Sequence, residues 1–406
     1  MKSLIWFVLL SGLVLVAGCT GAAAPAATPT APAATAAPTE AAAPAASATA
    51  APTDTPAPTA TTAATATTAA LATTAATATS QAEADMPAEG LFTVYGEDPV
   101  VPHGQPGDWD GQYTDPGAVV YHDGLYHMFH NGFVGWPAPV GIAYSTSPDG
   151  FDWTRASEDP VFKGDDLEYV GLTALASSAL VAEDGTWVLY FYIWEERTWP
   201  SPTKIGRATA PAPTGPWTAD DAPVLLPGGE GEWDAYAVRA PSVVRTDDGY
   251  LMFYTGYTQQ KAMIGMATSA DGVHWEKYDD PATTEAPFAE SDPVFRAEQV
   301  GEWTGGNVLQ PRVQLTPDGL VMLFSAGPSL TGVLAGLDYA LSDDGGLTWA
   351  AAPGPILEHT DVEGGRAIWF TDLLYQDGTY FIFFELGTGG MTEVYLATHE
   401  GSLPPP

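Results

Sequence analysis

Carboxylates and aromatic rings are the side chains of this sequence that could carry chemistry. Residues 90–406 contain 12 Lys or Arg against 45 Asp or Glu, and 12 of the 13 Trp lie beyond residue 100. Carboxylates serve as general acids, bases and nucleophiles, and aromatic rings stack well on sugars. An acidic surface also repels nucleic acid and anionic lipid. The composition therefore favours a carbohydrate partner and argues against a nucleic-acid partner.

Five copies of one pattern must position these side chains. Each copy has a β-prone run, an Asp-Gly turn and a second run rich in Tyr, Phe, Met and Leu, and the turns are Asp123-Gly124, Asp184-Gly185, Asp248-Gly249, Asp318-Gly319 and Asp377-Gly378. Asp-Gly between two such runs predicts a β-hairpin. Further short strands follow, as in residues 141–153 and 264–275. A single copy cannot bury both faces of its sheet, so the copies must stack and close. The sequence predicts an all-β, five-bladed β-propeller over residues 90–406.

Several phrases in this region resemble the five-bladed β-propeller glycosidases. They are Thr-Asp115-Pro-Gly, Arg239-Ala-Pro-Ser-Val-Val before a turn, LMFYTG from Leu251, and the repeated Ser-x-Asp-Gly-x-x-Trp. That superfamily includes glycoside hydrolase families 43, 62, 32 and 68 and the related family 130. The resemblance covers about residues 92–400. It implies a glycoside hydrolase acting on plant or microbial polysaccharides or oligosaccharides, with its reacting groups at the starts of the innermost strands.

The resemblance further implies an Asp base or nucleophile in blade one, an orienting Asp in blade three and a Glu acid in blade four. Two spaced carboxylates are needed because one protonates the leaving oxygen while the other acts on the opposite face of the sugar. Eight residues before the five turn Asp residues lie Asp115, Ala176, Ala240, Gln310 and Trp369. Asp115 fits the role of base or nucleophile. Ala240 and Gln310 cannot donate a proton, so the acid must come from elsewhere.

Other carboxylates near the predicted pocket rim are candidates for that acid. Glu196, with its neighbour Glu195, follows a strand of blade two; Asp234 precedes blade three; Glu302 precedes blade four; and Glu363 precedes blade five. We expect a second set of residues to bind the substrate: Arg239, Gln310, Arg312, Trp369 and Asp372. Asp372 is included because it occupies a position that is apolar in the other blades.

Two further functions stay open. The first is a non-catalytic, carbohydrate-binding surface lipoprotein whose pocket kept Asp115, Arg239, Gln310 and Trp369 but lost hydrolysis. The second is a sialidase, since residues 342–349 fit that clan's Asp-box, and Arg239, Arg312 and Arg366 could clamp a carboxylate. Sialidases have six blades, however, whereas the sequence repeats five times.

No metal or phosphate motif accompanies the repeats. His127 and His130 have odd spacing on a predicted strand, so they point to opposite faces. No stretch has the ligand spacing of a calcium loop. We therefore expect no cofactor and no catalytic metal, although the resemblance allows a structural calcium ion in the axial channel. We also expect a monomer.

The first 89 residues indicate where the protein is located. Residues 1–18 contain Lys2, an apolar run too short for a membrane span, and Val-Ala-Gly before Cys19, which together resemble a bacterial lipoprotein signal peptide. Residues 19–89 follow as the lipid-anchor Cys19 and a linker of Ala, Thr and Pro, which lacks the apolar side chains needed for folding. We expect an extracellular protein that is anchored to the membrane through Cys19.

Overall fold

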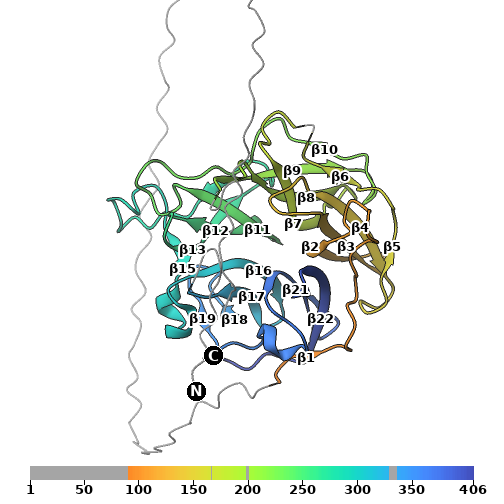
Figure 1. The fold of residues 1–406 in the computed structure, drawn as a ribbon. Coiled ribbons are helices and arrows are strands. Elements are labelled where there is room, and N and C mark those ends of the chain that lie inside the picture. The colour runs from red at the N-terminus through yellow and green to blue at the C-terminus, as the bar shows by residue number, and fades with distance from the viewer. Residues whose placement is uncertain (1–89, 166, 198–200, 329–335) are drawn as a thin grey trace, which may run out of the picture. The chain divides into compact units, whose positions relative to one another are not determined.

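The computed structural model describes residues 90–406, apart from 166, 198–200 and 329–335. The predicted signal peptide, Cys19 and linker lie outside the described residues. The described part is an all-β propeller of five blades, and Figure 1 shows the first strands β2, β7, β11 and β16 nearest its centre. The prediction of an all-β, five-bladed propeller is therefore confirmed.

Each blade contains four strands in antiparallel order from the axis to the rim. In the following list the strands run outward from the axis. Blade one has β2 (Tyr113–His122), β3 (Leu125–Phe133), β4 (Gly141–Ser147) and β5 (Thr154–Arg155); blade two has β7 (Thr173–Val181), β8 (Trp187–Trp194), β9 (Thr203–Ala210) and β10 (Thr218–Ala219); blade three has β11 (Ala237–Thr246), β12 (Gly249–Tyr257), β13 (Ala262–Ser269) and β14 (Glu276–Lys277). Blade four has β16 (Val308–Thr316), β17 (Gly319–Ala326), β18 (Gly336–Ser342) and β19 (Ala350–Ala351); blade five has β20 (Ile368–Gln376), β21 (Thr379–Thr388), β22 (Met391–Glu400) and β1 (Thr93–Val94).

Short elements complete the described structure. Strand β6 (Phe162–Lys163) pairs with β4, and β15 (Pro293–Phe295) pairs with β13. Three single turns of 3-10 helix are η1 (Ala297–Gln299), η2 (Glu302–Thr304) and η3 (His359–Asp361). Strand β1 comes from the start of the described chain and pairs with β22 from its end, so the two ends of the propeller sequence build the same blade.

The predicted hairpins are present, but their turns differ among blades. Asp123-Gly124 and Asp377-Gly378 form two-residue turns in which both residues have positive φ, between 48° and 83°. This is the geometry that favours Asn or Asp followed by Gly. In blade three, Gly249 pairs with Thr246, and in blade four, Gly319 pairs with Thr316. The turn residues there are Asp247-Asp248 and Pro317-Asp318, so the predicted Asp-Gly turns were displaced by one residue.

Large apolar side chains fill the spaces between blades. Phe129, Phe191 and Trp187 belong to one buried cluster joining blades one and two, and Phe253, Phe324 and Trp349 belong to another joining blades three and four. Aromatic residues of the second strands therefore supply most of the contact between neighbouring sheets. This burial explains why a blade cannot be stable alone.

The Asp-box phrase is a structural turn that recurs in this propeller. In blade four, Ser342 Oγ accepts a hydrogen bond from Gly346 N at 2.9 Å, and Trp349 Nε1 donates to Gly346 O at 2.9 Å. The same contacts link Ser147, Gly150 and Trp153 in blade one. A motif repeated for structural reasons gives no support to a sialidase, and neither does a ring of five blades.

Candidate active site

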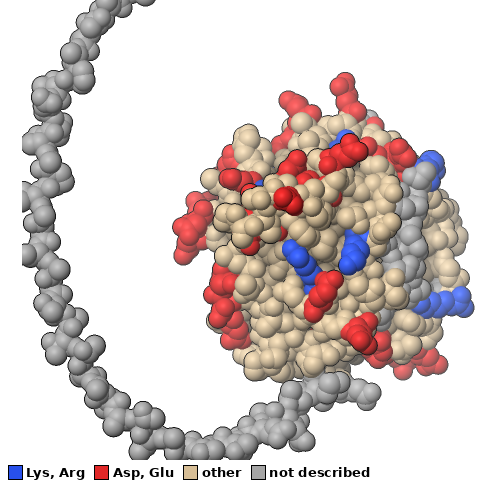
Figure 2. All heavy atoms as spheres, turned by 90° about the vertical axis from the view of Figure 1, so that its left-hand side faces the viewer, with Lys and Arg blue, Asp and Glu red and all other residues tan. Residues whose placement is uncertain are grey.

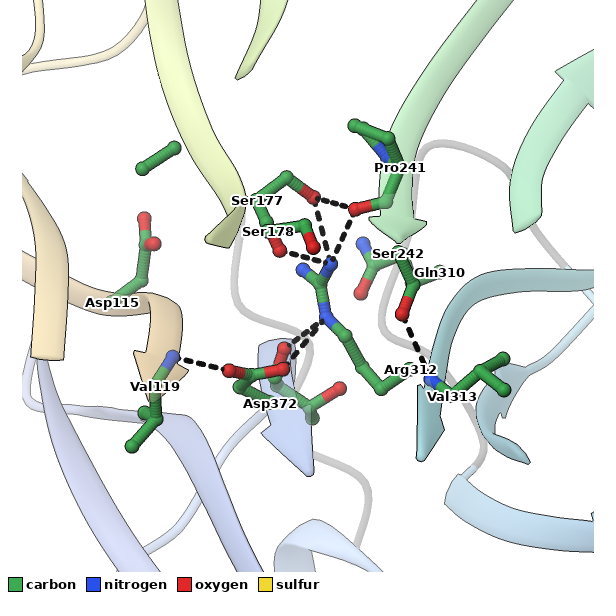
Figure 3. Close-up of polar contacts among 12 residues, drawn as sticks. Asp115, Val119, Ser177, Ser178, Pro241, Ser242, Gln310, Arg312, Val313 and Asp372 are labelled. Atoms are coloured by element: carbon green, nitrogen blue, oxygen red, sulfur yellow. Dashed lines mark hydrogen bonds and ion pairs between the residues drawn. The ribbon is translucent and has the colours of Figure 1, made fainter. Parts of the chain in front are cut away.

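Arg312 joins four blades at the propeller axis (Figure 3). This β16 side chain is 1% exposed; its Nε donates to Thr371 O of blade five at 2.5 Å, and its Nη1 donates to Ser177 O and Oγ of blade two at 2.8 and 2.7 Å. Nη1 also lies 3.4 Å from Pro241 O of blade three. A buried guanidinium that satisfies these backbone carbonyls holds the inner strands together.

Asp372 extends this connection to blade one. Its Oδ1 lies 3.8 Å from Arg312 Nε, and its Oδ2 accepts a hydrogen bond from Val119 N at 2.6 Å. Burial raises the pKa of Asp372 to about 6, although the charge of Arg312 and backbone hydrogen bonds act in the opposite direction. The sequence placed Arg312 and Asp372 among the substrate-binding residues, whereas their described contacts are with neighbouring inner strands.

The link from Asp372 to the next blade belongs to a repeated series. Ser178 Oγ of blade two accepts from Val243 N at 3.0 Å, and Ser242 Oγ of blade three accepts from Val313 N at 2.9 Å. In each case a polar side chain on one inner strand binds a backbone N–H of the next inner strand. The carboxylate at position 372 is therefore the blade-five member of a structural series whose other members are serines.

Asp115 stands at the start of β2, where the resemblance predicted a reacting carboxylate. Its side chain is fully buried, and its Oδ1 accepts a hydrogen bond from Asn131 Nδ2 at 2.7 Å. Asn131 is itself fixed by two bonds to Ala176 of blade two, which accepts at 3.1 Å through its carbonyl and donates at 2.7 Å through its N–H. Burial raises the pKa of Asp115 to about 7 despite the Asn131 hydrogen bond and the Arg312 charge.

A second carboxylate, Glu385, interacts electrostatically with Asp115 from the neighbouring blade. Glu385 lies on β21 of blade five and is 3% exposed. Burial raises its pKa well above the usual value, and the charge of Asp115 raises it further. Sequence analysis missed Glu385, although it is the one acidic residue in the second runs of the five repeats, within the phrase FIFFELGT. An acid inside that apolar run was the signal that could have identified it.

Both carboxyl groups have an oxygen available for a ligand or a proton. Among the described residues, neither Asp115 Oδ2 nor Glu385 Oε2 has a hydrogen-bond partner, and both atoms are buried. Two buried carboxylates in one site cannot both ionise cheaply, so one stays protonated. The pKa of Glu385 is raised well above its ordinary value and that of Asp115 to about 7, so Asp115 is the group that ionises first as the pH rises. This arrangement can perform paired acid and base chemistry.

The inner strands of blades three and four carry no acid at the position of Asp115. Asp115 pairs with Asn131, and the corresponding pairs are Arg239 with Thr255 and Leu309 with Ser325. A β-bulge follows each pair, and in it Ala240 and Gln310 have positive φ values of 51° and 55°. Counting back from the turns selected Ala240 and Gln310, which lie one residue beyond Arg239 and Leu309, the true equivalents of Asp115. None of these four residues carries a carboxylate.

The other predicted ligand residues lie at the same end of the inner strands. The Arg239 guanidinium donates to the Tyr257 hydroxyl and lies 5.9 Å from the Trp194 ring centre. Gln310 is 5% exposed, and its backbone N–H donates to Thr255 Oγ1 at 2.7 Å. Trp369 is half-buried within the bulge of β20. Arg239 and Trp369 thus lie at the same end of the inner strands as Asp115.

Three of the acids proposed from sequence, Asp234, Glu196 and Glu302, lie in other surroundings. Asp234 is fully buried, forms a 2.6 Å ion pair with Lys277 and accepts a hydrogen bond from Gly228 N at 3.1 Å. Asp110 forms the matching 2.6 Å ion pair with Arg155 in blade one. Glu196 and Glu302 are exposed on connecting segments. Asp234 therefore occupies a repeated structural position, and Glu385 is the better candidate for the acid.

Within the part of the chain that is described, no group of three or more His, Cys, Asp or Glu side chains is arranged to hold a metal ion. No helix in the same part is long and apolar enough to span a membrane.

Comparison with known proteins agrees with the fold. Residues 103–292 match the family model of the glycosyl hydrolases family 32 N-terminal domain. None of the curated proteins matches the chain in sequence. One similar solved structure, with 18% identity and a TM-score of 0.60, covers 78% of this chain and 96% of its own; it is described under family 130 mannoside phosphorylases, a family containing hydrolases that target β-1,2-mannosidic linkages in Candida mannan.

Two more solved structures share the fold. A glycosyl hydrolase from Bacteroides ovatus has 17% identity and a TM-score of 0.59, with coverage of 77% of this chain and 94% of its own. A thermostable family 43 glycoside hydrolase has 15% identity and a TM-score of 0.51, with coverage of 70% and 89%. The chain has the five-bladed propeller fold of these glycoside hydrolases, as its sequence phrases indicated.

Proposed function

We propose that this protein cleaves glycosidic bonds with Asp115 and Glu385 as its two reacting carboxyl groups. One observation carries the proposal: Asp115 and Glu385 are buried carboxyl groups from adjacent blades, the charge of Asp115 raises the pKa of Glu385, and each group has an oxygen without a described partner. Glycoside cleavage needs one protonated and one ionised carboxyl group. The pair supplies both states at neutral to slightly alkaline pH.

The roles follow from the direction of each pKa change. Glu385 stays protonated because burial and the Asp115 charge oppose its ionisation, so it can donate a proton to the leaving oxygen. Asp115, with a pKa of about 7, becomes the base or nucleophile once it ionises. Asn131 holds Asp115 Oδ1 in place and leaves Oδ2 for the reaction. Arg239 and Trp369, at the same end of the inner strands, would contact the sugar.

Leaving-group dependence tests the assignment of Glu385. We expect Glu385→Gln to lower kcat by roughly 10²–10⁴-fold on natural glycosides, as loss of a general acid does. Aryl glycosides with a dinitrophenol leaving group need no proton and should be cleaved far more readily by the variant. Arabinosides, xylosides, fructosides and mannosides form the panel. The exposed Glu363, mutated to Gln, is the matched control.

If Glu385→Gln lowered kcat equally on natural glycosides and on dinitrophenyl glycosides, Glu385 would not be the acid. Asp115→Asn should impair both kinds of substrate, because the base or nucleophile is needed whatever the leaving group. If Asp115→Asn kept the turnover of the wild type, the proposed mechanism would be wrong.

A non-catalytic sugar-binding protein is the second candidate, and one observation favours it. Asp115 is 0% exposed, and Arg239 and Leu309 replace the acids at its equivalent positions in blades three and four. Such a protein would bind glycans from the same panel without cleaving them. Absence of turnover in the wild type, together with saturable binding that Arg239→Ala weakens, would select this function.

We further propose that the protein is displayed on the bacterial surface through a lipid on Cys19. The proposal is supported by Val-Ala-Gly-Cys19 after an apolar run and by the Ala/Thr/Pro composition that follows. A diacylglyceryl-type group with more than one chain would give stable attachment, whereas one acyl chain binds reversibly. Membrane fractionation of a Cys19→Ser variant tests it.

A further inference from the structure

A groove lies outside the carboxylate site, beside the segments that lead into β2 and β22. Its volume is about 710 Å³, and its lining includes Trp109, Gly111, Gln112, Val134, Pro139 and Met391. These residues precede β2, connect β3 to β4, or begin β22. All three segments lie at the end of the propeller where the inner strands begin. The groove therefore opens on the same end of the propeller as the start of β2, where Asp115 stands.

Gln112 fixes the two rims of the groove. Its Oε1 accepts a hydrogen bond from Gly135 N at 2.9 Å, and its Nε2 lies 3.3 Å from Gly390 O as donor. Its backbone carbonyl also accepts from Thr392 N at 3.1 Å. One residue thus holds the blade-one loop and the blade-five loop in place. A groove with fixed walls loses little entropy when a ligand enters.

Trp109 gives the groove a rigid aromatic surface. Its Nε1 donates to Glu158 O at 3.0 Å, and a Cβ added to Gly132 or Gly141 would lie 2.8 or 2.7 Å from its ring. These two glycines leave the space that the ring occupies. The ring lines the groove, and the Arg155 guanidinium carbon lies 5.2 Å from the ring centre, so Trp109 is fixed where it could meet a sugar.

Most side chains that line the groove are apolar, and its one charged lining residue is the exposed Asp108. Val134 is 53% exposed and Met391 is 40% exposed. Uncharged sugars present C–H faces to apolar side chains and hydroxyl groups to a carboxylate such as Asp108. The excess of 45 acidic over 12 basic residues in 90–406 would repel an anionic glycan. The chemistry of the groove therefore matches a neutral glycan.

We propose that this groove binds further sugar units of a neutral oligosaccharide whose reacting unit lies at Asp115, an inference that rests on the proposed function. Gln112 precedes Asp115 by three residues, which is about 10 Å along a strand. That distance exceeds the length of one sugar ring. Tyr113, between them, pairs with Thr392, the neighbour of Met391. A ligand that occupied both places would therefore have to be a chain of sugars rather than a single one.

A pair of surface double variants tests the groove without disturbing the core. Val134→Ser with Met391→Ser alters the groove, and Leu315→Ser with Leu125→Ser is the control. Leu315 is 57% exposed, close to the 53% of Val134, and Leu125 is 40% exposed, as Met391 is. Both leucines lie near the hairpin ends of their strands, β16 and β3, at the opposite end of the inner strands from the groove. The probes are mannan, inulin, arabinan and xylan oligosaccharides of two to six units, aryl monoglycosides, and polygalacturonate as the anionic probe.

We expect the groove variant to lose about tenfold in kcat/KM on the longer neutral oligosaccharides and to keep aryl monoglycoside activity. The control variant should match the wild type on every probe. An equal loss on short and long substrates, or no loss on either, would overturn the inference while leaving the proposed function intact. A higher kcat/KM on polygalacturonate than on the neutral oligosaccharides would also overturn the inference.

Binding measurements separate this inference from the proposed function. If the wild type cleaves nothing but binds neutral chains more tightly as they lengthen, and the groove variant loses that dependence, the groove assignment stands and catalysis fails. If neither cleavage nor length-dependent binding of any neutral probe is found, the groove assignment is wrong.

Discussion

Glu385 gives Asp115 a partner that the inner strands of blades three and four do not supply. Leu309 and Arg239 occupy the positions equivalent to Asp115, so the acid that we propose lies on the second strand of blade five. Both carboxyl groups are buried, which raises the pKa of each, and the charge of Asp115 raises the pKa of Glu385 further. Such perturbation is typical of functional sites, although structural ion pairs produce it too.

Arg239 and Trp369 should contact sugar rather than support the fold. Arg239→Ala or Trp369→Ala should weaken glycan binding by about tenfold, since each removes a proposed sugar contact. Isothermal titration with the neutral oligosaccharides measures the effect, and thermal unfolding provides the control. A drop of several degrees in Tm with unchanged binding would assign the residue to structure instead.

The inner strands depend on buried polar links as well as on apolar packing. Arg312 binds carbonyl groups of blades two and five, and Asp372 binds the N–H of Val119 in blade one. If one residue of such a network is removed, its partners stay buried without a hydrogen bond or an opposite charge, which is destabilising. The propeller therefore closes through its axis as well as through the pairing of β1 with β22.

Arg312→Met should destabilise the propeller by about 3–5 kcal/mol, the usual cost of breaking a buried pair. Arg245→Met is the matched control, because Arg245 forms a surface ion pair with Glu183 across blades two and three. An exposed pair of this kind contributes about 0–1 kcal/mol. Urea unfolding measures both variants; similar midpoints for the two would contradict a structural role for Arg312.

Local patterns predicted the strands well, and longer-range geometry explains the failures. Asp-Gly between apolar runs correctly indicated five hairpins, because turn formation depends on adjacent residues. In blades three and four, however, the glycine pairs within the strand, which shifted the counting from Asp248 and Asp318 by one residue. Glu385 approaches Asp115 only after blade five packs beside blade one. No spacing within the sequence could predict that Glu385 and Asp115 lie in one site.

The whole molecule combines an acidic surface with a single candidate lipid site. Figure 2 shows acidic side chains outnumbering basic ones on the visible face. Such a surface would be repelled by anionic lipid headgroups, so attachment to a membrane requires a covalent anchor. Cys19 is the one cysteine of the sequence and follows a signal-like segment.

Cys19→Ser should move the protein from the membrane fraction to the soluble fraction or leave its signal peptide uncleaved. The expected reason is loss of the acylated thiol, and immunoblotting of fractionated cells measures it. A parallel Ser11→Ala variant, within the signal region, is the control for processing. Unchanged membrane recovery of Cys19→Ser would contradict the lipid anchor.

The pH dependence of kcat/KM tests the carboxylate pair most directly, because it reports the ionisation of the free enzyme that the structure describes. Asp115 must be ionised, so activity should rise with pH through about 7, and it should fall at higher pH when Glu385 loses its proton. In Glu385→Gln, measured with a dinitrophenyl glycoside, the alkaline fall should disappear, whereas the acid limb should stay near pH 7, because burial raises the pKa of Asp115 and a protonated Glu385 adds no charge. An acid limb near the ordinary aspartate pKa in the wild type, or an alkaline fall that persists in Glu385→Gln, would contradict the account.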